Sequence, residues 1–150
     1  MRDFADLDEL TAAKGEHLGH GDWLEVTQDR IDQFADATGD HQWIHVDADR
    51  AKDGPFGTTI AHGYLTLSLI PMLGKQIYRV GGIKMGINYG LDKVRFPSVV
   101  HVGARVRTGI ELVEVTDRQE GKLVMVRHTV EIEDSEKPAC VADSLVLYVR

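Results

Sequence analysis

Apolar residues in the first half of the chain follow the spacing of an amphipathic helix. Ile31 is followed by apolar side chains three and four residues later, which places them on one helix face. Thr27 is a suitable N-cap before this pattern, and Gly39 is suited to the left-handed position that ends many helices. The pattern predicts a helix between these two residues, with Asp40 on the loop directly after it.

The longest helical pattern runs from Ile60 to about Tyr78 and is broken by Gly81-Gly82. Its first half is apolar nearly all round, because six large side chains cannot share one stripe: Leu65, Leu67, Leu69, Ile70, Met72 and Leu73. A helix of this kind has to be covered by other structure. The chain also predicts a short leading helix over Phe4–Leu10 and a short strand over Trp23–Val26.

The second half of the chain changes to the period of β-strands. Residues 104–112 and 124–132 alternate between apolar and polar side chains, which predicts two strands with one buried face each. Residues 117–121 supply the turn between them. Residues 140–149 are apolar on both faces, as in a central strand. With an earlier strand over 85–95, this half is expected to form an antiparallel meander.

Helices first and strands later indicate an α+β fold. At 150 residues the chain is expected to form a single domain over residues 1–150. A sheet with one apolar face beside one nearly all-apolar helix suggests that the sheet curls around the helix.

Charge and composition exclude several classes of partner. A net charge of −7 argues against nucleic acid, which requires a clustered basic face, and Arg105 and Arg107 are expected on a solvated strand face. The most apolar stretch, Ile60–Leu73, is too short to cross a bilayer, which takes about 20 residues. No secretory or transit signal is recognised, and the lone Cys140 excludes an intramolecular disulfide. A cytoplasmic protein without a membrane partner is therefore expected.

Ionisable side chains gather between Asp36 and Asp47. This segment holds three carboxylates and two imidazoles, among them Asp40 and His45. Shortly afterwards, residues 57–63 lead into the buried helix, where a helix entry offers unpaired N–H groups and a partial positive charge. Gly63 would let a ligand approach the backbone closely. These groups suit proton transfer beside a carbonyl whose oxygen gains negative charge.

The same residues resemble a known family. Gly39-Asp40-x-x-x-x-His45-x-Asp47, followed by Thr59-Ile60-Ala61-His62-Gly63, looks like the hydratase-2 motif of the MaoC-like dehydratases, the (R)-specific enoyl-CoA hydratases. The likeness covers nearly the whole chain, includes Lys93–Pro97, and is close to the small single-domain mycobacterial members. It implies a hot-dog fold, with a long central helix wrapped by a curved antiparallel sheet, usually as a homodimer.

The resemblance also implies the reaction and the roles of the site residues. Asp40 and His45 match the pair that holds the water added to a trans-2-enoyl thioester, and the Gly63 N–H matches the oxyanion donor. Ser68 matches a polar helix position that supports the pair, and His62 is expected to hold the loop against the helix start. The substrate would be an enoyl-CoA or an enoyl-acyl carrier protein. No cofactor is expected, and no metal either, because the histidine spacing fits no standard zinc signature.

Other interpretations of these residues stay open. Asp40 could simply satisfy groups at a helix end, as aspartates in turns often do. A thioesterase on the same architecture would direct water at the carbonyl carbon instead. A non-catalytic acyl-binding subunit of a heteromer would keep the fold without the chemistry. The chain also departs from the family pattern, because Gln42-Trp43 stands where many members have Asn-Pro, which affects substrate choice more than reaction type.

Overall fold

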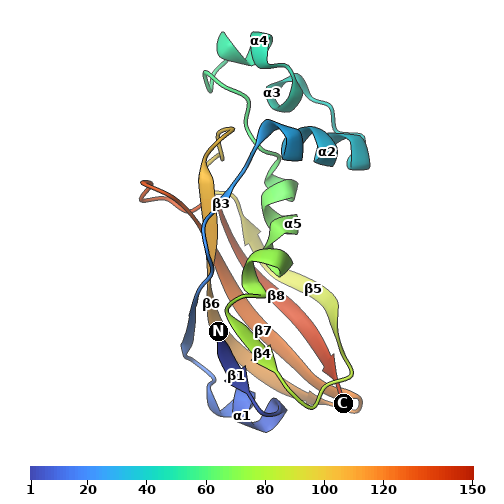
Figure 1. The fold of residues 1–150 in the computed structure, drawn as a ribbon. Coiled ribbons are helices and arrows are strands. Elements are labelled where there is room, and N and C mark those ends of the chain that lie inside the picture. Colours follow the sequence, from blue (N-terminus) through green and yellow to red (C-terminus); the bar gives the residue numbers. More distant parts are fainter.

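The computed structural model describes residues 1–150 as a curved antiparallel sheet with one helix lying against it (Figure 1). The strands of the large sheet run in the order β2-β6-β7-β8-β5, and β3 pairs with β6. The helices are α1 (Leu7–Ala12), α2 (Gln28–Thr38), α3 (Trp43–Val46), α4 (Ala48–Lys52) and α5 (Gly63–Gly74). The strands are β1 (Arg2–Phe4), β2 (His17–His20), β3 (Leu24–Glu25), β4 (Tyr78–Val80), β5 (Met85–Arg95), β6 (Arg105–Arg118), β7 (Gly121–Ile132) and β8 (Cys140–Val149).

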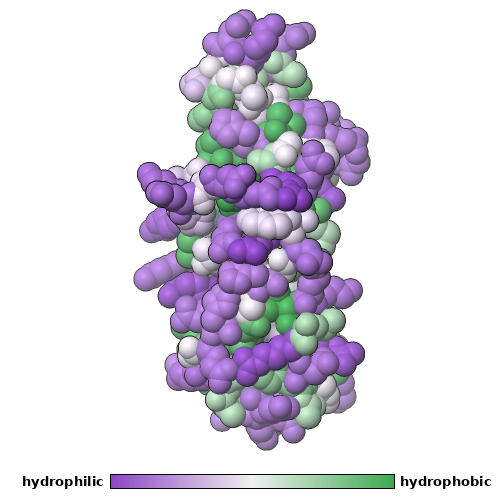
Figure 2. Space-filling view, turned by 60° about the vertical axis from the view of Figure 1, so that its left-hand side comes forward, coloured by the Kyte–Doolittle hydropathy of each residue, from purple (hydrophilic) through white to green (hydrophobic).

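The long strands follow the predicted alternation. Val106, Ile110 and Val130 are buried, whereas Arg107 and Glu131 face outward and form an ion pair of 2.7 Å directly opposite each other on β6 and β7. Such cross-strand pairs make one face polar, and the face shown in Figure 2 is largely hydrophilic. The expected solvated arginine face is confirmed.

The order of the strands corrects one prediction. Strands β6, β7 and β8 form the expected meander, but β5 pairs with β8 and not with its nearest neighbour in sequence. Strand β8 therefore has a paired neighbour on each side, β7 and β5, as expected for a central strand. Strand β5 becomes the edge of the sheet.

The longest helix is shorter than predicted. Helix α5 covers Gly63–Gly74, whereas the pattern predicted a helix from Ile60 to about Tyr78. Before the helix, the Ile60 amide donates to Ile44 O (3.0 Å) and the Ala61 amide to Val100 O (2.8 Å). After it, residues 78–80 form β4 and pair in parallel with β1. Hydrogen bonds to distant parts of the chain therefore end the helix on both sides. The spacing of apolar residues along the sequence does not reveal these bonds.

Helix α5 buries one side in the core. Leu65, Leu69, Ile70 and Leu73 pack with the apolar faces of β6, β7 and β8. The other side is open in a single chain, since Tyr64 and Met72 are exposed. The predicted covering of the helix is thus confirmed on one side.

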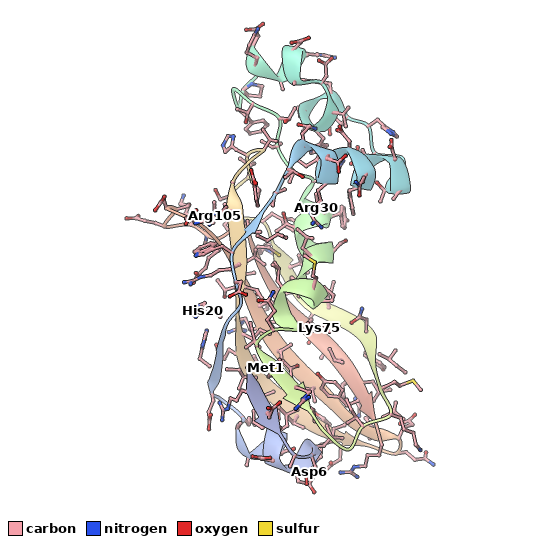
Figure 3. The ribbon with its side chains drawn as sticks, in the orientation of Figure 1. Met1, Asp6, His20, Arg30, Lys75 and Arg105 are labelled. Atoms are coloured by element: carbon pink, nitrogen blue, oxygen red, sulfur yellow. The ribbon has the colours of Figure 1, made fainter.

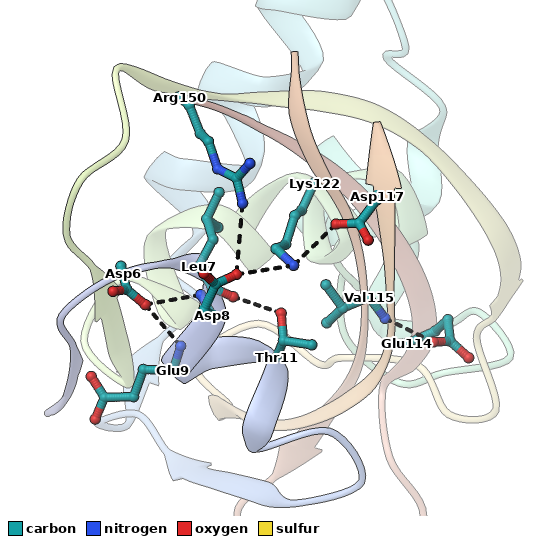
Figure 4. Close-up of polar contacts among 10 residues, drawn as sticks. All are labelled: Asp6, Leu7, Asp8, Glu9, Thr11, Glu114, Val115, Asp117, Lys122 and Arg150. Atoms are coloured by element: carbon teal, nitrogen blue, oxygen red, sulfur yellow. Dashed lines mark hydrogen bonds and ion pairs between the residues drawn. The ribbon is translucent and has the colours of Figure 1, made fainter. Parts of the chain in front are cut away.

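The amino-terminal segment closes the far end of the sheet. The predicted leading helix is confirmed as α1, and Asp6 caps it by accepting from the amides of Asp8 and Glu9 at 2.9 and 2.8 Å. Lys122 bridges Asp8 (3.3 Å) and Asp117 (3.1 Å), which ties α1 to the β6–β7 turn (Figure 4). Strands β1 and β2 were not predicted, because three or four residues are too few to show a period. None of the helices has the length and apolar character needed to span a membrane.

Candidate active site

Three chain segments meet at the amino end of α5. Helix α2 begins after its cap Thr27 and ends at Gly39, whose φ of 79° is left-handed, as the sequence predicted. Asp40 follows on the loop. Helix α3, which the sequence did not predict, then carries His45. Figure 1 shows α2, α3 and α4 grouped beyond this end of α5.

A small polar network fixes these segments to one another. The side-chain amide of Gln28, on α2, donates to His45 O at 2.8 Å, and its oxygen accepts from the Thr59 hydroxyl. Thr59 also accepts from the Val102 amide at 3.0 Å through its carbonyl. Helices α2 and α3 and the approach to α5 are thereby held in one arrangement.

Trp43 braces the segment that lacks Asn-Pro. The Arg50 guanidinium lies 4.3 Å from the centre of the Trp43 ring, and a Cβ on Gly54 would come within 3.0 Å of the same ring. The indole therefore packs between α4 and the following turn. Asp47 caps α4 by accepting from the Arg50 amide at 3.0 Å, so it has a turn role.

The His45 imidazole has a defined tautomer. It is buried, at 7% exposure, and Nδ1 lies 2.7 Å from Ile60 O. A carbonyl oxygen can only accept, so Nδ1 carries the hydrogen and Nε2 is left with a lone pair. His45 thus presents a proton acceptor.

His62 contacts both Asp40 and His45. Its Nε2 donates to Asp40 O at 2.9 Å, which holds the loop against the start of α5. Its ring stacks on His45, with centroids 3.8 Å apart and planes inclined by 26°. Nδ1 of His62 is buried and has no hydrogen-bond partner.

Asp40 is exposed and lies beside this stack. The candidate ligand atoms of Asp40, His45 and His62 all lie within 4.8 Å of one another. Asp40 Oδ1 accepts from the Gln42 amide at 3.3 Å, so one oxygen does take part in a turn, as the simpler interpretation suggested. The other oxygen accepts no hydrogen bond from the chain and is available to a ligand.

The cluster has the residue types of a metal site, but one nitrogen of each histidine is already bonded. A metal is bound by nitrogen lone pairs that lie in the planes of the rings, at about 2.0–2.1 Å. His45 Nδ1 and His62 Nε2 already carry hydrogens that they donate to backbone carbonyls, so each of the two stacked rings has only one nitrogen left for an ion. The arrangement suits proton transfer better than metal binding.

Burial sets the charge state of His45. Desolvation lowers the pKa of His45 below its ordinary value, and the neighbouring His62 lowers this pKa further. The hydrogen bond to Ile60 and the Asp40 carboxylate act in the opposite direction without reversing the shift. His45 is therefore neutral near pH 7.

The start of α5 provides a free donor. The Gly63 amide donates to no acceptor in the chain, and it opens a helix of 12 residues. A Cβ at this position would lie 3.2–3.3 Å from the Phe96 ring, so glycine allows the ring to pack closely on the start of the helix. An oxygen with developing negative charge would be stabilised by this N–H and by the helix dipole.

A cavity of about 690 Å³ begins one turn further along α5. It lies between that helix and strands β5, β7 and β8, and Ser68 is part of its wall. The Ser68 hydroxyl donates to Tyr64 O at 2.7 Å and makes no hydrogen bond to Asp40 or His45. The sequence did not indicate this cavity, because its wall combines residues from α5, β4, β5, β6, β7 and β8, which only the fold brings together.

The chain was compared with known proteins. A family model described as a MaoC like domain matches residues 9–134. The 3-hydroxyacyl-thioester dehydratase Z of Mycobacterium tuberculosis is 57% identical over 150 residues, covering 99% of each chain. Nodulation protein N of Rhizobium leguminosarum is 44% identical over 144 residues, covering 94% of this chain and 89% of that protein. The chain belongs to the MaoC-like dehydratase family.

A solved structure supports the fold. The unliganded (R)-hydratase of Pseudomonas aeruginosa matches with a TM-score of 0.75 at 21% identity, covering 91% of this chain and 82% of that one. The predicted α+β class and hot-dog fold are thereby confirmed.

The charge state of His45 can be tested by nuclear magnetic resonance. We expect its ring proton to titrate with a pKa below the ordinary 6.5, because burial disfavours the charged form. His41 is a control in the same segment, since its hydrogen bond to Asp36 raises its pKa above that value. A His45 titration at or above 6.5 would contradict this description of the site.

Proposed function

We propose that the protein catalyses the reversible (R)-specific hydration of trans-2-enoyl thioesters to 3-hydroxyacyl thioesters. The observation that carries this proposal is that Asp40, which keeps one free carboxylate oxygen, and His45, whose Nε2 is unprotonated, have ligand atoms within 4.8 Å of each other at the amino end of α5, where the Gly63 amide is free. The proposal is supported by the 57% identical relative, whose name states a 3-hydroxyacyl-thioester dehydratase. The protein would accordingly be a hydro-lyase without a cofactor.

The geometry supports a mechanism with one water molecule. Water donates hydrogen bonds to Asp40 and to Nε2 of His45. Its oxygen forms a bond to C3 while the double-bond electrons move onto the thioester oxygen, which gains enolate charge and is held by the Gly63 N–H. His45 accepts the proton released from the water and passes it to C2 as the enolate collapses. The hydroxyl at C3 and the hydrogen at C2 then account for all atoms of the water.

The supporting residues follow from the same arrangement. His62 positions the pair, since it binds the Asp40 carbonyl and stacks on His45. A supporting role for Ser68 remains a prediction, because its hydroxyl is used inside the helix. The carrier would be coenzyme A or an acyl carrier protein. The single cysteine, Cys140, is buried and unpaired, which suits a cytoplasmic enzyme.

We further propose that the chain forms a homodimer through strand β5. This edge strand leaves its outer hydrogen-bonding groups unpaired and exposes four large apolar side chains: Met85, Ile87, Tyr89 and Leu91. An unprotected apolar edge of this length is a template for pairing with another strand. A second copy would extend the sheet across β5.

The catalytic pair can be tested with crotonyl-thioester. Asp40→Asn and His45→Gln are each expected to reduce kcat by ~10²–10⁴-fold, because each removes one acid–base partner of the water. The measurement is the loss of enone absorbance, with free thiol assayed in parallel.

Two controls lie on the same segment. Asp36→Asn and His41→Gln remove only an exposed ion pair of 2.9 Å, and we expect near wild-type rates. Loss of enone absorbance without free thiol supports hydration, whereas release of free thiol would instead support the thioesterase. An inactive wild-type homodimer that gains activity only with a second kind of chain would support the heteromeric subunit.

The dimer can be tested by sedimentation. The wild type is expected at twice the mass of one chain, and Ile87→Lys at the mass of one chain, because a buried charge in the shared edge is costly. Glu136→Lys introduces the same side chain in the β7–β8 turn and should leave the dimer intact. If Ile87→Lys sediments like the wild type, the interface lies elsewhere.

A further inference from the structure

The cavity beside α5 has an unusual inner end. At the end nearer Gly63, its wall holds Leu67 and Ile70 together with Ser68, whose hydroxyl is already bonded within the helix. Where α5 ends, the exposed Lys75 and four uncharged polar side chains line it: His128, Ser144, Tyr78 and Tyr148. Figure 3 labels Lys75 at this end of α5, away from Arg30 on α2. The volume of about 690 Å³ lies within the range of small-molecule sites, about 300–1,000 Å³.

His128 is the most deeply buried of these groups. It is 5% exposed, and burial lowers its pKa to about 4, so it is neutral near pH 7. Nδ1 has one distant contact, with the Thr108 hydroxyl at 3.4 Å. Nε2 has no hydrogen-bond partner in the chain. Buried polar atoms are usually paired, so an imidazole that lines a cavity with a free nitrogen is suited to a ligand.

The two tyrosines provide a free hydrogen. Their hydroxyl oxygens lie 2.9 Å apart, and neither has another partner. One hydroxyl donates to the other, which leaves the second hydrogen unused. Ser144 has only a long contact of 3.5 Å, to Val126 O. The inner end therefore offers neutral donors and acceptors that the chain does not satisfy.

We propose that this cavity selects acyl chains that carry a hydroxyl or keto group near their far end. The inference rests on the proposed function, since the thioester is placed at Gly63. A neutral group of this kind can both fill the site and satisfy His128 and the tyrosine pair. A carboxylate fits less well, because the one cationic side chain on the wall, Lys75, is exposed.

Helix geometry gives the position of the group. His128 contacts Gly74, where a Cβ would lie 3.3 Å from the imidazole. Gly63 and Gly74 are separated by about 16 Å along the helix axis at about 1.5 Å per residue. An extended acyl chain advances about 1.2 Å per bond, because an extended protein backbone spans up to about 3.6 Å over the three bonds of one residue. The polar group is therefore roughly a dozen bonds from the thioester carbon.

The test compares enoyl-coenzyme A esters of about twelve to fourteen carbons that differ only at the far end. We expect the terminally hydroxylated ester to exceed the unsubstituted one in kcat/KM by at least about tenfold, because a site with unpaired polar groups rejects a chain that lacks the partner. A carboxylated ester is the third substrate. A higher rate for it, or equal rates for all three, would overturn the proposal.

Variants assign the effect to the inner end. His128→Leu and Tyr148→Phe are each expected to bring the hydroxylated-to-unsubstituted ratio close to one. Tyr148→Phe removes a single oxygen, so it provides the test if His128→Leu does not fold. Tyr64→Phe is the matched control, because it also removes a single tyrosine hydroxyl, but one that is exposed and lies outside the cavity wall, and it should keep the wild-type ratio. Variants that retain the wild-type ratio would contradict the proposal.

The crotonyl ester separates this inference from the proposed function. Its chain is too short to reach His128. If crotonyl-thioester is hydrated but the long esters show no preference for the hydroxyl group, the inference is wrong and the proposed function stands. If no ester is hydrated, the proposed function is wrong.

Discussion

Burial of helix α5 is the constraint on which the rest of the structure depends. Its four core residues, Leu65, Leu69, Ile70 and Leu73, have to be removed from water, and the curved sheet is the surface that accepts them. Once the helix lies on the sheet, its amino end points toward α2 and α3. The free Gly63 amide is thereby placed beside the segment that holds Asp40 and His45. The burial of α5 thus determines both the packing of the core and the geometry of the site.

The site gains its chemical definition from backbone carbonyls. Ile60 O fixes the hydrogen of His45 on Nδ1, and Asp40 O accepts the hydrogen of His62. These bonds involve groups that every residue has, so side-chain identity alone does not reveal them. As a result, the His45 imidazole presents Nε2 as a proton acceptor, and the His62 imidazole holds the loop that carries Asp40. The stack between the rings and the burial of His45 favour the neutral form that accepts a proton.

Much of this could be predicted from the sequence, where local chemistry determines the result. Thr27 and Gly39 marked the ends of α2, and the alternation in β6 and β7 marked their buried faces. The resemblance carried by Asp40, His45 and Gly63 indicated the family. The prediction was wrong where distant partners decide. Ile60 and Tyr78 have helical neighbours in sequence but pair with Ile44 and β1 in space.

No pattern of neighbouring residues in the sequence predicts where β5 lies in the sheet or that the cavity exists. Strand β5 joins β8 across the whole meander, and no spacing within Met85–Arg95 specifies that neighbour. His128 falls on the apolar face of the alternating pattern over residues 124–132, so the pattern alone predicts a core residue. The structure shows it buried with only a distant contact to Thr108. A polar residue in an apolar pattern was the available signal, and its partners could not be read from the sequence.

The central claim is that Asp40 and His45 hold the water that is added at C3. The most direct measurement is a crystal structure of the Asp40→Asn variant with a bound 3-hydroxyacyl-coenzyme A. The account predicts that the C3 hydroxyl lies within hydrogen-bonding distance of residue 40 and of Nε2 of His45, with the thioester oxygen on the Gly63 amide. A complex with the thioester carbon between residues 40 and 45, and C3 remote from both, would contradict it.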